Sequence, residues 1–170
     1  MELSGMSLKE YMNVLESDAP APGGGSAAAV AGAQGCALTA MVCALSLGKV
    51  KYEAFEPLLR EVREKTLSLQ KNFLEVTDRD TKTFAVMTAV FAMPKSTEQE
   101  KSAKKLAMQN ALKVCTEPPM DMMRFALQAL EAAAKITGKS NETAASDLGV
   151  AALNLKAALQ GAWLNVLINI

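Results

Sequence analysis

The chain of 170 residues is long enough for one domain with a sizeable core, and its 18 basic and 18 acidic residues balance, so charge favours neither a nucleic-acid partner nor a membrane surface. It contains no histidine, which excludes the commonest general base and the commonest metal ligand and leaves carboxylates, lysines, tyrosines and amides for any catalysis. Aromatic residues make up only 5% of the chain, and the abundance of Ala, Leu and Met favours helices over strands.

A glycine turn near the N-terminus is the most distinctive local motif. Before it, a capping box at Ser7–Glu10 predicts a first helix that runs to about Ser17. The turn consists of Pro20, Ala21, Pro22, Gly23, Gly24, Gly25 and Ser26, with the serine as the expected cap of the next helix. The first amides of a helix lack internal partners, so this turn suits an anion or a polar ligand. The alternative is a linker that leads into a closely packed core helix.

The segment that follows, Ala27–Leu47, is uncharged over its whole length. It is long enough to cross a membrane, but it is mostly Ala and Gly, contains Gln34 and lacks an aromatic belt. We therefore expect a buried helix rather than a membrane span, and no signal peptide before it. The cysteines Cys36, Cys43 and Cys115 show no paired spacing and lie among apolar residues, which indicates reduced core thiols in a cytoplasmic protein.

The rest of the chain also reads as helices. A polar turn at 48–52 leads into a very long helix from about Ala54 to Ala92, which Met93-Pro94 ends. A second capping box at Thr97–Glu100 starts a helix that is expected to finish before Pro118 and Pro119. Two more helices are expected, at about Pro119–Thr137 and from Ser140-Asn141 to the end. Residues 1–170 are thus predicted to form a single all-α domain, a bundle of about six helices.

One carboxylate interrupts the apolar stripe of the long helix. The stripe follows steps of three and four, through Phe55, Leu59, Val62, Thr66, Leu69, Phe73, Val76, Asp80, Phe84, Met87 and Phe91. Asp80 occupies a position that its neighbours reserve for apolar groups, and a carboxylate there is costly unless it is paired or useful. It is either a candidate catalytic group or a core aspartate satisfied by a hydroxyl or a lysine.

The last helix carries a polar stripe on an otherwise apolar surface. Asp147, Ala151, Asn154, Ala158, Gly161, Asn165 and Asn169 fall within an arc of about sixty degrees. Exposed faces normally carry Lys and Glu, so one carboxylate and three carboxamides separated by small residues indicate something else. The stripe is either the wall of a ligand groove or a polar seam between subunits, and both readings stay open.

These motifs together resemble the formimidoyltetrahydrofolate cyclodeaminase and methenyltetrahydrofolate cyclohydrolase family. The matching elements, in order, are Pro22–Ser26 with the Ala/Gly helix, Gly48–Tyr52, Asp78-Arg79-Asp80 with Phe84, Met93-Pro94-Lys95, and Ser146–Ala152 running on to Asn165–Asn169. The resemblance spans nearly the whole chain. It implies an all-helical domain that usually dimerises and acts on a one-carbon derivative of tetrahydrofolate, without a metal or a cofactor. Family members usually continue beyond Asn165–Asn169 into a further helical segment.

The resemblance also suggests roles for individual residues. Asp80 would shuttle a proton, and Asp147 would stabilise the cationic carbon or share that work. Backbone amides at Gly23, Gly24, Gly25 and Ser26 would receive the pterin or a carbonyl, while Asn154, Asn165 and Asn169 would bond pterin edges or one another across a dimer. Lys49 and Lys51 would attract the glutamate tail of the folate, unless they are simply solvated, and Tyr52 would stack on the substrate or staple the turn.

Two reactions are compatible with these groups: closure of formimidoyl-tetrahydrofolate to methenyl-tetrahydrofolate with loss of ammonia, and hydration of the methenyl bridge to formyl-tetrahydrofolate. The sequence does not choose between them, because only the leaving or entering group differs. A rival hypothesis is a helical interaction module that uses the small-residue helix and the asparagine seam for assembly alone. That hypothesis gives no reason for an aspartate within an apolar stripe.

Overall fold

The computed structural model describes residues 2–170, and this part of the chain is helical without strands. Five α-helices follow one another: α1 (Leu8–Leu15), α2 (Gly24–Ala44), α3 (Glu56–Phe91), α4 (Glu98–Lys135) and α5 (Ala145–Leu167). Three short 3₁₀ helices join them: η1 (Leu3–Gly5), η2 (Val50–Phe55) and η3 (Glu142–Ala144). The all-α class is confirmed, and the two expected capping boxes, Ser7 with Glu10 and Thr97 with Glu100, start α1 and α4.

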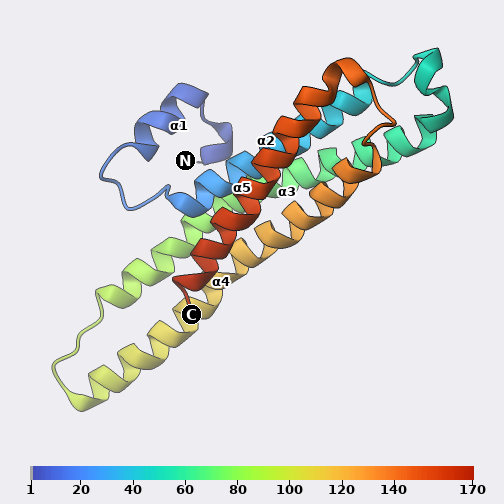
Figure 1. The fold of residues 1–170 in the computed structure, drawn as a ribbon. Helices are drawn as coiled ribbons and strands as arrows, with labels where there is room; N and C mark the ends of the chain where they lie inside the picture. Colours follow the sequence, from blue (N-terminus) through green and yellow to red (C-terminus); the bar gives the residue numbers. More distant parts are fainter. Residues whose placement is uncertain (1) are drawn as a thin grey trace.

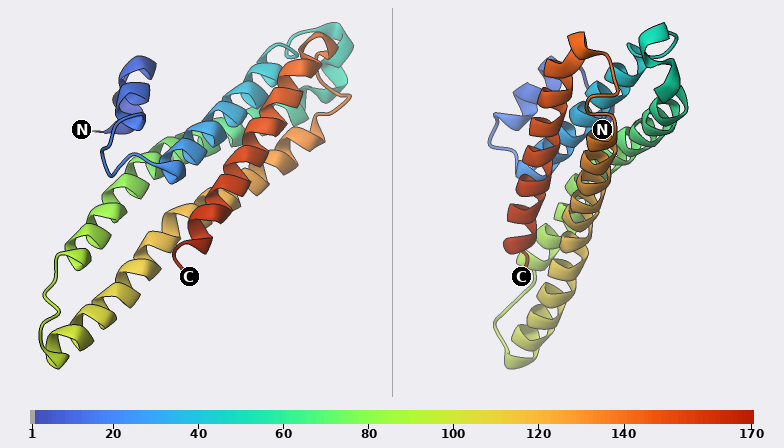
Figure 2. Two further views of the ribbon diagram at one scale, coloured as in Figure 1. Left: turned by 60° about the vertical axis from the view of Figure 1, so that its left-hand side comes forward. Right: turned by 45° about the vertical axis from the view of Figure 1, so that its right-hand side comes forward.

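The four long helices form a bundle of unequal lengths (Figure 1). α3 and α4 make a long hairpin, and α2 and α5 lie side by side along part of it, α2 against α3 and α5 against α4. The far part of the hairpin projects beyond both, as the two turned views in Figure 2 also show. α1 stands apart at the N-terminus and buries one residue, Tyr11. The C-terminus of the chain therefore lies partway along the hairpin.

The expected break at Pro118 and Pro119 is wrong, because α4 continues through both prolines. A proline inside a helix removes the hydrogen bond to the carbonyl four residues earlier. For Pro119 that carbonyl belongs to Cys115, and the Asn169 side chain donates to it instead, with 3.1 Å between Nδ2 and O. Both prolines are fully buried, so core packing offsets the remaining cost. One long helix replaces the two that local sequence signals predicted, hence five helices rather than six.

α2 packs closely on its neighbours because glycines remove side chains where helices meet. A Cβ on Gly32 would come within 2.4 Å of the Phe73 ring, and one on Gly161 of α5 would come within 2.9 Å of the Cβ of Ala28. Ala151 and Ala158 are fully buried. The middle of the predicted polar stripe on α5 is therefore core, and it forms no groove wall within the chain.

The start of α2 and its hydropathy can both be compared with the sequence predictions. The helix begins at Gly24 with Gly23 as its N-cap, so Ser26 lies inside the first turn and does not cap it. Within residues 2–170, α2 is the one helix long and apolar enough to cross a membrane, with a mean hydropathy of 1.6 in its best window. About half of that window, 56%, is buried inside the bundle.

Candidate active site

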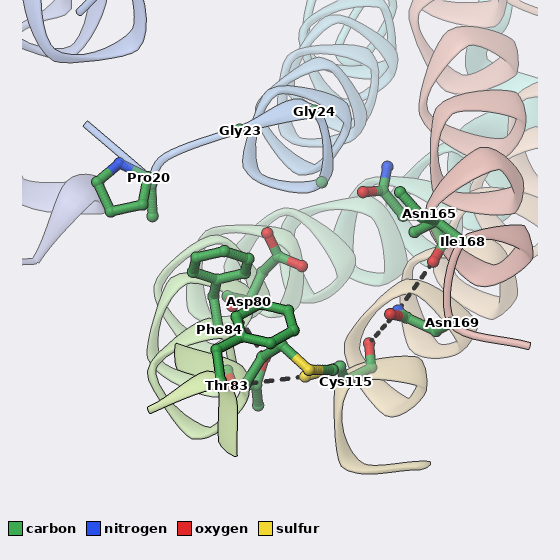
Figure 3. A pocket seen from close by; sticks show the side chains of 14 residues that line it. Pro20, Gly23, Gly24, Asp80, Thr83, Phe84, Cys115, Asn165, Ile168 and Asn169 are labelled. Atoms are coloured by element: carbon green, nitrogen blue, oxygen red, sulfur yellow. Dashed lines mark hydrogen bonds between the residues drawn. The ribbon is translucent and has the colours of Figure 1, made fainter. Parts of the chain in front are cut away.

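A pocket of about 300 Å³ opens where α2 begins, α3 passes its midpoint and α5 ends. The α1–α2 linker, α3, α4 and the last turn of α5 all contribute to it (Figure 3). Its lining residues are Pro20, Ala21, Gly23, Gly24, Gly25, Asp80, Thr83, Phe84, Met87, Phe91, Cys115, Asn165, Ile168 and Asn169. The structure thus brings together the glycine turn, Asp80 and two of the three predicted asparagines.

Asp80 is the carboxylate of this pocket, and it lies directly on the first turn of α2. The Ser26 hydroxyl donates to Oδ2 at 3.1 Å. A Cβ on Gly25 would come within 2.6 Å of both Asp80 oxygens, so only glycine leaves room for the carboxylate there. Burial raises the pKa of Asp80 above its usual value, and hydrogen bonding from the Ser26 side chain and backbone partly opposes that rise.

Ser26 hydrogen-bonds Asp80 and is not exposed in the pocket. The residue is fully buried, and its hydroxyl also lies 3.2 Å from the Thr81 hydroxyl. The positive end of the α2 dipole faces the Asp80 carboxylate, which is the arrangement that favours a negative charge at a helix N-terminus. The first turn of α2 therefore binds a carboxylate of the protein itself, Asp80, whereas the sequence had predicted that its amides bind a ligand.

Asn165 and Asn169 stand on the α5 side of the opening (Figure 3). The Asn165 NH₂ group donates to the Gly161 carbonyl at 2.8 Å. The Asn169 NH₂ group donates to the carbonyls of Cys115 at 3.1 Å and Asn165 at 2.9 Å. Both amides are therefore held in place by the backbone through their nitrogens. Among the described residues neither Oδ1 accepts a hydrogen bond, so both oxygens are free to accept from a ligand.

The remaining walls are apolar. The predicted core stripe of α3 is only partly confirmed beyond Asp80: Met87 is buried, but Phe84 and Phe91 are 38% and 59% exposed. They are not core residues, because α2 and α5 end before this part of α3 and leave it uncovered. On α4, the Cys115 thiol donates to the Thr83 carbonyl at 3.4 Å. Burial and the charge of Asp80 both raise the pKa of this thiol. Sequence reasoning missed Thr83, Cys115 and Ile168, since nothing local marks them.

The other predicted site residues lie at the far end of the bundle. Lys51 is exposed and paired with Glu142, with 2.7 Å between Nζ and Oε1. Tyr52 is buried, and its hydroxyl accepts from the Glu142 amide at 3.1 Å, so it staples η2 to η3. Both residues line a second cavity, of about 520 Å³, between α4 and α5. Lys49 is exposed in the same turn.

Asp147 also belongs to this far end, in the first turn of α5. It precedes Asn165 by 18 positions on one helix, which corresponds to about 27 Å along the axis. Asn154, half-buried, lies between the two. One chain therefore assembles Asp80, the glycine turn, Asn165 and Asn169, and leaves Asp147, Lys49, Lys51 and Tyr52 elsewhere.

The site uses no metal-binding constellation. Within residues 2–170, no group of three or more Cys, Asp or Glu side chains is arranged to hold an ion. A shielded carboxylate beside carboxamide oxygens and aromatic rings suits proton transfer to a flat, polar organic molecule. Fold and site thus define a helical-bundle protein with a small-molecule pocket built around one carboxylate.

The comparisons with known proteins identify the family. The family model for formiminotransferase-cyclodeaminase matches residues 7–170, so the chain belongs to that family. It is 37% identical over 163 residues to a methenyltetrahydrofolate cyclohydrolase from Methylorubrum extorquens, covering 96% of this chain and 78% of that protein. It is also 31% identical to the formimidoyltransferase-cyclodeaminase of Gallus gallus, of whose length it covers 30%.

A solved structure agrees with the fold. The crystal structure titled formiminotetrahydrofolate cyclodeaminase from Thermotoga maritima matches with a TM-score of 0.86 and 33% identity. The match covers 99% of this chain and 80% of that one. The resemblance drawn from the sequence motifs is thereby confirmed at the level of the family and of the fold.

Proposed function

We propose that the protein is a folate enzyme that hydrates the one-carbon bridge of methenyl-tetrahydrofolate, with Asp80 as its proton shuttle. The observation that carries this is the Asp80 carboxylate, buried enough to raise its pKa and open to the pocket. A raised pKa brings the titration of a carboxyl closer to the operating pH, which favours acid–base catalysis. Membership of the family and the 37% identity to a cyclohydrolase support the choice of substrate.

One carboxylate is enough to carry out the proton transfer of the hydration reaction. Water attacks the cationic methenyl carbon, and Asp80 takes one proton from it as the carbon–oxygen bond forms. The protonated Asp80 then gives that proton to a folate nitrogen as its bond to the carbon breaks. The second water proton leaves to solvent as the formyl C=O forms. Phe84 and Phe91 provide apolar walls for the ring system, and the oxygens of Asn165 and Asn169 accept hydrogen bonds from it.

A second candidate is the cyclodeaminase reaction, favoured by the solved structure that bears this title. There the formimidoyl group reacts in its protonated, amidinium form: a folate nitrogen attacks its carbon, and Asp80 carries the proton that this nitrogen loses to the NH₂ group. The carbon–nitrogen bond then breaks, ammonia departs, and the cationic methenyl bridge is left. Measuring methenyl-tetrahydrofolate hydrolysis and ammonia release side by side separates the two reactions. Loss of both activities in Asp80→Asn supports the assigned role, and wild-type rates in that variant would overturn it.

We further propose that two copies of the chain form a homodimer through the outer surface of α2 and α5. α2 carries no charged residue, so it presents apolar surface outward as well as inward. On α5, Leu153 and Leu164 are 67% and 65% exposed. Exposed large apolar side chains beside an uncharged helix are typical of an interface. Sedimentation analysis should give a dimer that Leu153→Glu dissociates, whereas a wild-type monomer would contradict the proposal.

The dimer also offers a place for the predicted residues at the far end. A two-fold axis across the middle of α2 and α5 exchanges the two ends of the bundle. Lys49, Lys51, Tyr52 and Asp147 of one copy would then lie beside Asp80 of the other. Lys51 would draw the negatively charged tail of the folate, Tyr52 would line the approach, and Asp147 would face the cationic carbon. Asn154, midway along α5, would lie near the axis and bond its counterpart.

Mixing two inactive variants tests this composite site. If Asp80 and Asp147 from different copies share a site, a random mixture of Asp80→Asn and Asp147→Asn protein regains about a quarter of wild-type activity, because each mixed dimer holds one intact site. If each site lies within one copy, mixing restores nothing. Full activity of Asp147→Asn alone would remove Asp147 from the mechanism.

Thermal-shift measurements distinguish the enzyme from a helical interaction module. A reduced folate at a hundred times its dissociation constant should add about 2.7 kcal/mol of stability. The absence of a shift with any reduced folate would favour the module. The cytoplasmic location, the absence of a cofactor and the absence of nucleic-acid and membrane partners stay predictions.

A further inference from the structure

The carbonyl of Cys115 cannot form the usual backbone hydrogen bond within α4. Its ordinary donor would be the amide of residue 119, and a tighter 3₁₀ bond would come from the amide of residue 118. Both positions are proline, so neither has an N–H group. The ring of Pro119 also crowds this carbonyl, which favours its tilting away from the helix axis. Two buried prolines therefore leave a strong acceptor free on a residue that lines the pocket.

A second carbonyl without its usual backbone partner lies nearby, at the end of α5. The Asn169 amide bonds the Val166 carbonyl at 2.9 Å, so it is not donated to the Asn165 carbonyl four residues earlier. The Asn169 side chain bonds both free carbonyls (Figure 3). Its Nδ2 lies 2.9 Å from the Asn165 oxygen and 3.1 Å from the Cys115 oxygen. Each of the two hydrogens of this NH₂ group therefore has an acceptor.

These two bonds fix which atom of Asn169 can bind a ligand. Both donors of the NH₂ group are used, whereas Oδ1 accepts no hydrogen bond among residues 2–170. Rotation of the carboxamide by half a turn would place Oδ1 against two carbonyl oxygens, which are acceptors as well. Because Asn169 lines the pocket, the ligand group that meets it has to be a donor.

Asn165 provides a comparison within the same pocket. Its NH₂ group donates to one carbonyl among the described residues, that of Gly161 at 2.8 Å, so a second donor stays available. Asn165 can therefore both donate to a ligand and accept from it. Asn169 can only accept, because the Cys115 carbonyl takes its second donor.

We propose that Pro119 is a positioning residue of the active site: it keeps the Cys115 carbonyl free for Asn169 and thereby fixes the Asn169 oxygen as an acceptor for N–H groups of the bound molecule. The inference rests on the proposed function only in taking a folate as that molecule, since the amino and amide groups of a pterin ring are donors of this kind. Pro119 does not line the pocket, so it affects binding through Asn169 and leaves the proton transfer at Asp80 unchanged.

NMR of the Asn169 side chain tests this positioning without any folate. The two N–H signals of its carboxamide are followed in ¹⁵N-labelled protein and assigned by their loss in Asn169→Ala. In Pro119→Ala the new amide takes the Cys115 carbonyl, so one of the two protons should shift upfield and exchange faster with water. Pro118→Ala is the matched control, because its new amide is aligned with the Val114 carbonyl and leaves that of Cys115 to Asn169. Both replacements favour the helix, so neither should prevent folding.

Steady-state kinetics with methenyl-tetrahydrofolate tests the consequence for binding. Loss of one oriented hydrogen bond should raise the KM of Pro119→Ala by about 2- to 10-fold and leave kcat unchanged. Pro118→Ala should keep the wild-type KM. In an Asn169→Ala background, Pro119→Ala should raise KM no further, because Pro119 acts through that side chain.

The outcomes separate the positioning role from the proposed function. Unchanged Asn169 signals or an unchanged KM in Pro119→Ala would overturn the role of Pro119. Equal effects of the two proline variants, or additive increases in KM in the double variant, would overturn it as well. Absence of turnover in the wild-type protein would count against the proposed function alone, and the NMR comparison would still decide the role of Pro119.

Discussion

Gly25 lies so close to the Asp80 carboxylate that its replacement by alanine should strongly reduce catalytic activity. The added Cβ would stand 2.6 Å from both oxygens of Asp80 and 2.8 Å from its Cγ, where ordinary contact begins at 3.4 Å. The carboxylate would have to retreat by about 0.8 Å from the first turn of α2, and misplacement by about 1 Å can cost about a hundredfold in rate. We therefore expect kcat to fall by about 10- to 100-fold.

Stability should change much less than activity in this variant. Overpacking costs about 1–3 kcal/mol, whereas replacing a helical glycine by alanine gains about 1 kcal/mol. Steady-state hydrolysis of methenyl-tetrahydrofolate and urea unfolding measure the two quantities on one sample. Gly32→Ala is the matched control, because its Cβ meets the Phe73 ring in the core and leaves Asp80 alone. It should lower the free energy of unfolding and preserve kcat. A Gly25→Ala protein with the wild-type kcat would refute the argument that Asp80 must stay on this turn.

Three further predictions concern protonation, the prolines and the thiols. Burial raises the pKa of Asp80, so ionisation of this carboxyl lowers the stability of the folded protein as pH rises from 3.8 through the raised value. Asp80→Asn should therefore be more stable than wild type above that pH window. Below it the difference in stability should disappear, as thermal unfolding at several pH values would measure. Asn169→Ala should cost about 1–2 kcal/mol in denaturant unfolding, and less when Pro119→Ala restores an amide for the Cys115 carbonyl; equal costs in both backgrounds would contradict the account of α4. Cys115 should react with a thiol reagent before the two cysteines of α2, whose thiol pKa values burial raises to about 12 and about 11, and a bound folate should slow that reaction.

Local rules account for most of the helices. The capping boxes and the apolar stripe predicted α1 and the extent of α3 to within about two residues, because caps and side-chain periodicity depend on near neighbours along the chain. The same rules failed at Pro118 and Pro119. There the partner that replaces a lost backbone bond is Asn169, 54 positions away from Cys115, and no local pattern contains it.

The candidate site divides in a similar way. Asp80 could be singled out as a carboxylate within an apolar stripe, and its pairing with a hydroxyl was one of the alternatives considered. That the hydroxyl belongs to Ser26, which was assigned to a ligand, depends on how α2 crosses α3. Likewise, Asp147 and Asn165 share a helix face, but they lie about 27 Å apart along α5. A shared face therefore does not place two residues in the same site.

The sequence by itself therefore determined the helical class, the family resemblance and two candidate carboxylates, Asp80 and Asp147, since each follows from composition, periodicity or ordered motifs. Only the tertiary structure decided which groups meet around Asp80: the first turn of α2, the end of α5 and the linker between α1 and α2. The physical reason is that the hydrogen bond to Asp80 comes from Ser26, 54 positions away along the chain, and that α4 and α5 complete the pocket around it. The approach of these helices depends on tertiary packing rather than on any local preference.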